Sequence, residues 1–168
     1  MMDVKLARWR LKDRERLKYV VSNVQKDFLS DRLYGYTLED AGNWIGMVME
    51  HDEKDGIFRA IVVEGEIIGS ISLRKKSDVY RKDAEIGYFL LTEKWSKGIM
   101  TESVKQICDI GFKTMDIVRI TGMVHEPNTA SRKVLEKNGF VLEGIMKDAV
   151  FKNREFVNLC IYGKYKMK

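Results

Sequence analysis

The residues best suited to chemistry lie in Ile86–Thr101, where an apolar strand pattern gives way to an amphipathic helix pattern. Residues 84–91 alternate and are rich in aromatics, which predicts a strand, and apolar residues recur at helical spacing in Met100–Met115. The first N–H groups of a helix have no intrahelical acceptor and lie at the positive end of its dipole, so they suit a phosphate. Gly98 would let such an anion approach the backbone, and Lys97 would add a positive charge. Alternatively, the glycine only eases a strand-to-helix turn.

A second junction of the same kind follows about thirty residues later. Residues 117–124 predict a strand, and residues 129–138 predict a helix. Pro127, the only proline of the chain, stops the strand because its φ is fixed and it restricts the residue before it. Asn128 is placed to cap the helix, which would explain this residue without any chemistry. Ser131 lies in the first turn and is either a small helix-start residue or part of a site.

The elements that must position these junctions can be predicted from periodicity and turn residues. The expected strands and helices, in chain order, are a strand at 4–9, helices at 13–26 and 37–50, strands at 57–63, 67–73 and 84–91, a helix at 99–115, a strand at 117–124, a helix at 129–138, and strands at 140–147 and 156–165. Thr37 with Asp40 resembles a capping box at the second helix. This order predicts an α/β fold, a mixed sheet with helices on its faces.

Four segments resemble the GNAT superfamily of acyl-CoA-dependent N-acyltransferases, and in particular its RimJ/RimL-like branch. They are E-I-G-Y-F-L (85–90), W-S-K-G-I-M-T-E-S (95–103), H-E-P-N-T-A-S-R-K-V-L-E-K-N-G-F (125–140) and L-E-G-I-M-K-D-A-V-F-K-N (142–153). The resemblance implies one GNAT domain over residues 1–168. It also implies a mostly antiparallel sheet of six to seven strands with about four helices, splayed between the fourth and fifth strands. The splay would admit the pantetheine arm of acetyl-CoA, the expected co-substrate.

The resemblance also implies which residues bind acetyl-CoA. The expected contacts are made by Leu90, Leu91, Lys97, Gly98, Ile99, Met100, Thr101, Asn128 and Ser131. The family's loop often begins with Gln or Arg and ends with Gly or Ala, whereas this chain has Trp95 and Met100 in those places. The backbone contacts to the pyrophosphate do not depend on these side chains.

Three catalytic residues follow from the same resemblance. The backbone N–H of Leu90 would polarise the thioester carbonyl, because an N–H aimed at a developing oxyanion stabilises the tetrahedral intermediate. Many family members use a tyrosine to protonate the departing thiolate, but this chain has Leu135 at that position. The expected proton donor is therefore Ser131, with a water as the alternative. RimL-like enzymes carry a glutamate at the position of Val150, so the expected base moves to Glu85. Its alternative reading is a solvent-facing strand residue.

His125 is a second candidate for the base, because imidazole titrates near neutral pH. The choice of acceptor limits how strong a base is needed. An α-amine with pKa of about 8 costs about 1 kcal/mol to deprotonate at pH 7, whereas a lysine-like amine costs roughly 4.6 kcal/mol. The resemblance to RimJ/RimL implies a protein N-terminal α-amine as the acceptor, and such an amine tolerates a weak or water-mediated base. The residues of 27–48, including Tyr34, Tyr36 and Trp44, are expected to line the acceptor side or to belong to the core.

The expected reaction is direct transfer of an acetyl group, because neither cysteine lies in a recognisable nucleophile arrangement. The alternatives are acetylation of a small-molecule amine, such as a polyamine, amino acid or antibiotic, and a catalytically silent acyl-CoA-binding protein. The chain contains no G-x-G-x-x-G or G-x-x-x-x-G-K-[ST] motif, which argues against a dinucleotide binder or a P-loop nucleotidase.

Composition predicts a folded cytoplasmic protein. The chain has 45% apolar and 33% charged residues, with no membrane-length apolar run and no signal-peptide pattern. The net charge of +5 is dispersed, so no nucleic-acid partner is expected. Arg74–Lys76 with Arg81 and Lys82 is the densest basic cluster, either a solvated loop or a contact for a polyphosphate or acidic partner. Cys108 and Cys160 are expected as reduced buried thiols, with no metal site. The resemblance to RimL-like proteins also implies a homodimer.

Overall fold

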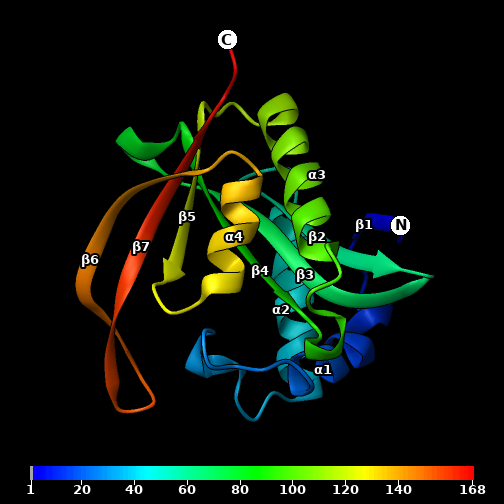
Figure 1. Cartoon of the computed structure of the whole chain (residues 1–168). Helices are drawn as coiled ribbons and strands as arrows, with labels where there is room; N and C mark the ends of the chain where they lie inside the picture. Colours follow the sequence, from blue (N-terminus) through cyan, green and yellow to red (C-terminus); the bar gives the residue numbers. More distant parts are fainter. Residues whose placement is uncertain (1) are drawn as a thin grey trace.

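The computed structural model describes residues 2–168, which form a sheet with helices on both faces (Figure 1). In chain order the strands and α-helices are β1 Val4–Arg8, α1 Arg14–Ser22, α2 Leu38–His51, β2 Gly56–Val63, β3 Glu66–Lys75, β4 Asp83–Leu90, α3 Ile99–Thr114, β5 Arg119–His125, α4 Thr129–Lys137, β6 Val141–Lys152 and β7 Glu155–Tyr165. Short 3-10 turns precede α1, follow β4 and lie within the α1–α2 and β3–β4 loops.

The sheet has seven strands in the order β1-β2-β3-β4-β5-β7-β6 among the residues described. Every neighbouring pair is antiparallel except β4 and β5, which run parallel. The predicted fold class, a mixed and mostly antiparallel sheet of six to seven strands with about four helices, is therefore confirmed.

The two parallel strands pair over only part of their length. Their register runs from Asp83 with Arg119 to Ile86 with Gly122, and no pair is formed beyond that point. Each strand remains paired on its other side, β4 with β3 as far as Leu90 and β5 with β7 as far as His125. The sheet therefore opens between the C-terminal halves of β4 and β5, as the predicted splay requires.

Helices α3 and α4 lie on one face of the sheet, and α1 and α2 lie on the other (Figure 1). Strand residues alternate between two cores accordingly. The α3/α4 core includes Ile61, Ile71, Ile107 and Ile120, and the α1/α2 core includes Leu17, Ile45, Phe58 and Ala60. None of the helices in the described part of the chain is both long enough and apolar enough to cross a membrane.

Element boundaries follow local hydrogen bonds that periodicity does not show. Helix α1 ends at Ser22 rather than near residue 26, because the backbone N–H of Asn23 donates to Val20 and its side chain donates to Tyr19. Strand β6 continues to Lys152 rather than to residue 147, because its pairing with β7 resumes after a register shift. The predicted capping box of Thr37 and the predicted cap by Asn128 are both present.

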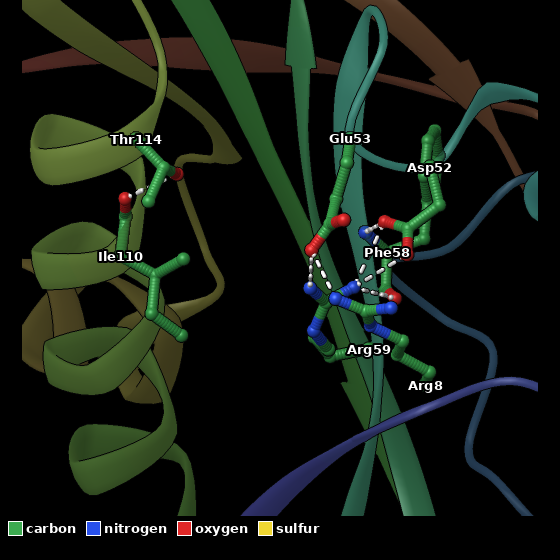
Figure 2. A network of polar contacts seen from close by, with 7 residues as sticks. All are labelled: Arg8, Asp52, Glu53, Phe58, Arg59, Ile110 and Thr114. Carbon is green, nitrogen blue, oxygen red and sulfur yellow. Dashed lines mark hydrogen bonds and ion pairs between the residues drawn. The ribbon is translucent and has the colours of Figure 1, made fainter.

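A buried ion pair fixes the connection between α2 and β2 (Figure 2). The Arg59 guanidinium is 7% exposed and donates to both carboxylate oxygens of Asp52 at 2.8 Å. Glu53 accepts from Arg59 at 3.3 Å and also from Arg8. Because an unpaired buried charge is strongly destabilising, this network holds the end of α2 against β1 and β2.

Candidate active site

The start of α3 presents free backbone donors beside the sheet opening. Gly98 has φ of +77°, and Ser96 also has a positive φ, which turns the chain sharply into the helix. The N–H of Glu102 donates to Gly98 O at 3.1 Å, so the N–H groups of residues 99–101 precede this first helical bond. A Cβ built on Gly98 meets nothing within 4 Å, so the space above this backbone is open. Anion binding at these amides stays a prediction, and the turn leaves room for it.

The backbone of Leu90 points into the opening. Bonding groups alternate sides along an antiparallel strand, and the N–H of Leu91 donates to Ile68 in β3 at 2.8 Å. The N–H and C=O of Leu90 therefore point toward β5, which no longer pairs with β4 at this level. The indole N–H of Trp95 donates a hydrogen bond to the C=O of Leu90 at 2.9 Å. Leu90 is buried, so its side chain packs in the core while its backbone faces the gap between β4 and β5.

Leu91, which the sequence also predicts at the cofactor, is placed differently. Its N–H is used within the sheet, and its side chain is only 2% exposed. Lys97 is exposed at the turn before α3.

The start of α4 borders the other side of the opening. Asn128 Oδ1 accepts from the backbone N–H of Ser131 at 3.2 Å, so the cap fixes the first turn of the helix. The hydroxyl of Ser131 lies 2.6 Å from the hydroxyl of Tyr88 in β4. Sequence reasoning did not assign Tyr88. Strand alternation could have found it, since it shares a face with Ile86 and Leu90.

The phenol of Tyr88 and the side chain at position 135, where many family members have a tyrosine, are both buried, with different consequences. Burial raises the pKa of Tyr88 to about 12, so the phenol stays protonated at neutral pH. Leu135, where many family members have a tyrosine, is fully buried, and its Cδ1 lies 2.7 Å from a Cβ built on Gly122. The side chain at position 135 therefore packs against β5 within the core.

The opposite face of the sheet carries the two candidate bases. Glu85 pairs with Thr121, on the paired part of β4 and β5, and is half-buried. His125 ends β5 on the same face, because residues 121, 123 and 125 alternate with the α3/α4 core residues Ile120 and Val124. The four residues from Thr121 to His125 span roughly 13 Å. Glu85 therefore lies at the closed end of the opening and His125 at its mouth.

The α1–α2 loop, residues 23–37, crosses this mouth. Gln25 N donates to Thr92 Oγ1 just after β4 at 2.7 Å, and the Phe28 ring packs edge-on against His125 with centroids 5.9 Å apart. Lys152 in β6 donates to Leu29 O at 2.9 Å and to the carboxylate of Asp31 at 2.7 Å. Figure 1 shows the loop beneath the strand ends, between the tip of the β6–β7 hairpin and α1.

The loop controls the environment of His125. Burial, and then the positive charge of Lys152, hold the pKa of His125 below its usual value. His125 is therefore neutral at pH 7, and a neutral imidazole can accept a proton.

The predicted acceptor-lining aromatics separate into two groups. Trp44 packs edge-on against Trp9 at 5.5 Å, and Tyr36 packs on the same α1/α2 core. Tyr34 is 50% exposed and lies under the ammonium of Lys152 at 4.6 Å, near the opening. Val150, in place of the family glutamate, pairs with Val157 in the β6–β7 hairpin.

Two further predictions concern residues outside the opening. Cys108 and Cys160 are unpaired and buried as expected, and burial raises the pKa of the Cys108 thiol to about 12, so it is not a nucleophile. In the basic cluster, Lys76 pairs with Asp83 and Lys82 with Asp116. Both pairs lie near the N-terminal end of β4, opposite to the end from which the chain enters α3.

Comparison with known proteins relates the chain to one protein family. Residues 3–141 match the family described as "Acetyltransferase (GNAT) domain". The probable N-acetyltransferase YjcK of Bacillus subtilis is 38% identical over 120 residues, which cover 68% of this chain and 65% of that protein. The ribosomal-protein-serine acetyltransferase of Escherichia coli is 29% identical over 119 residues, covering 71% and 66%. The chain spans about half to two thirds of the length of the curated relatives it matches.

Solved structures agree on the fold. RimL, a ribosomal L7/L12 alpha-N-protein acetyltransferase solved in complex with coenzyme A, superposes with a TM-score of 0.87 at 23% identity. The match covers 96% of this chain and 93% of RimL.

Proposed function

The chain belongs to the acetyltransferase (GNAT) domain family, and from this premise we propose that it transfers an acetyl group from acetyl-CoA directly to a protein N-terminal α-amine. The observation that carries the proposal is the parting of β4 and β5 after Ile86, beside the open N-terminus of α3. Such an opening lets a thioester on one face of the sheet meet an amine on the other face. The free amides next to the opening suit the diphosphate of the coenzyme.

Acetyl-CoA fits the α3/α4 side of the opening. The amides of residues 99–101 bind the pyrophosphate, with Lys97 adding charge and Gly98 leaving room. The pantetheine arm then runs between α3 and α4 toward Leu90, past Asn128. RimL, which has the same fold, was solved in complex with coenzyme A, and this supports coenzyme A as the ligand.

The chemistry uses both faces of the sheet. The amine attacks the thioester carbonyl, and the N–H of Leu90 stabilises the oxyanion that develops. Ser131, on the α4 side, protonates the departing thiolate. Glu85 or His125, on the acceptor face, takes the proton of the amine. No covalent enzyme intermediate is required, because the two cysteines are buried.

The openness of the acceptor face supports a polypeptide acceptor. Helices α1 and α2 pack on β2 and β3, whereas Met123 on β5 and Met146 on β6 remain 40% and 46% exposed on that face. The end of a polypeptide can reach this surface without being enclosed. The ribosomal acceptors named for the relatives point to the same class. An α-amine also needs only a weak base, since its pKa is about 8.

Release of the coenzyme A thiol from acetyl-CoA tests this function. The purified chain is supplied with peptides that have a free N-terminus, with peptides whose N-terminus is blocked but which contain lysine, and with polyamines, amino acids and aminocyclitols. The proposal predicts turnover with the free α-amines in preference to all others. Turnover confined to small amines would assign the runner-up function, and tight acetyl-CoA binding without turnover on any amine would indicate a silent acyl-CoA-binding protein.

A further inference from the structure

The hydroxyl pair of Tyr88 and Ser131 joins the two sides of the opening. Tyr88 extends from the half of β4 that does not pair with β5. Ser131 extends from the first turn of α4, 43 residues later in the chain. Their oxygens are 2.6 Å apart, which is a short hydrogen bond between two hydroxyls. The backbone of Ser131 is fixed separately by Asn128. The remaining freedom of Ser131 is the direction of its hydroxyl proton.

The direction of this bond decides whether Ser131 can act on the sulfur. Each hydroxyl has a single proton. If Ser131 donates to Tyr88, its proton is not available for a leaving group. A phenol is far more acidic than an aliphatic hydroxyl and is the stronger donor, so the favoured arrangement has Tyr88 donating and Ser131 accepting. The proton of Ser131 is then free to point into the opening.

We propose that Tyr88 is a positioning residue for acetyl transfer, which donates its hydroxyl proton to Ser131 Oγ and thereby directs the Ser131 proton toward the coenzyme A sulfur. This inference rests on the proposed function. As the C–S bond breaks, its electron pair stays on sulfur and the sulfur takes the Ser131 proton. The Tyr88 proton shifts to Ser131 Oγ, and water restores the proton of Tyr88 when the products leave.

The alternative is that the bond only anchors β4 to α4. The chain provides a matched control for this role in Tyr162 of β7. Its hydroxyl is also buried, donates to Glu136 at 2.9 Å and accepts from Arg132 at 2.9 Å, so it anchors the same helix to another strand. Tyr162→Phe therefore removes a comparable anchor without touching Ser131.

The test compares Tyr88→Phe, Tyr162→Phe, Ser131→Ala and the double variant Tyr88→Phe/Ser131→Ala. Thermal melting, kcat and the KM for acetyl-CoA are measured with the best acceptor of the wild-type chain. We expect Tyr88→Phe to lower kcat by roughly tenfold or more with KM changed less than about twofold, since an orienting interaction acts on the transition state. Tyr162→Phe should lower the melting temperature but leave kcat within about twofold. The double variant should be no slower than Ser131→Ala, because the two hydroxyls act as one unit.

Two results would overturn the inference while the proposed function stands. One is a wild-type kcat in Tyr88→Phe. The other is a double variant slower than Ser131→Ala by the full factor of Tyr88→Phe, since independent effects multiply. Failure of the proposed function is read separately from the wild-type chain, as acetyl-CoA binding without any turnover, and it would remove the basis of the inference as well.

Discussion

At the scale of single residues, the candidate site divides its groups between the two faces of the sheet. Ser131 and Tyr88 lie on the α4 side, where the proposed mechanism places the departing thiolate, and Glu85 and His125 lie on the opposite face, where it places the amine. A proton can therefore leave the amine on one face while another reaches the sulfur on the other. This separation removes the need for one residue to do both tasks.

The acceptor face leads to a prediction about pH. If His125 is the base, kcat/KM falls as the pH drops through its lowered pKa, because the protonated imidazole cannot accept a proton. Phe28 and Lys152 face His125, and Lys152 is paired with Asp31. His125→Gln should then remove the contribution of His125 to the acidic limb, leaving the limb set by the acceptor α-amine with its pKa of about 8, and lower kcat/KM by about 100-fold.

Glu85→Gln is the matched variant on the same face. A base at Glu85 predicts that Glu85→Gln lowers kcat/KM by about 100-fold, while the acidic limb of His125→Gln matches that of the wild-type chain. The full pH profile of kcat/KM for both variants decides between the two residues. Wild-type profiles in both would leave neither as the base, and a water would then have to accept the proton.

At the scale of elements, the turn into α3 is the feature on which the proposed binding of acetyl-CoA depends. Gly98 adopts a left-handed conformation with open space above it, and this conformation costs a residue with a Cβ about 1–2 kcal/mol. The proposed site uses two properties of this turn, the direction of its amides and the room that it leaves for the diphosphate. A side chain at this position disturbs both.

Gly98→Val should therefore weaken acetyl-CoA binding by tenfold or more, roughly 1.4 kcal/mol. The control is Gly65→Val in the β2–β3 turn, where φ is +79° and nothing lies within 4 Å of a built Cβ. The two variants should lose similar stability, but only the first should lose affinity in calorimetry. Equal affinities would show that the turn does not hold the diphosphate.

Much of this architecture could be predicted from sequence, because it rests on local chemistry. Alternation and helical spacing predict the strands and helices, and Asn128 caps α4 as its type and position suggest. What could not be predicted depends on register and on distant contacts. The approach of Tyr88 to Ser131 requires β4 and α4 to meet across the opening. The contact of Lys152, in β6, with the α1–α2 loop requires the shifted pairing of β6 and β7.

At the scale of the whole molecule, the sheet is open between β4 and β5, and each of these strands is held by the neighbour on its other side. β3 holds β4 and β7 holds β5, so the opening after Ile86 and Gly122 does not depend on a ligand to form. The α1–α2 loop crosses its mouth on the acceptor side, and α3 and α4 flank it on the other. Both substrates can therefore meet in one complex, each from its own face.

The central claim is this direct meeting of a thioester and an amine. Mass spectrometry of the chain incubated with acetyl-CoA, before and after addition of a peptide with a free N-terminus, tests it most directly. We predict an unmodified protein at every time point and a peptide that carries one acetyl group on its α-amine. An acetylated protein that transfers its acetyl group when the peptide is added, or a peptide that stays unmodified at saturating acetyl-CoA, would contradict the account.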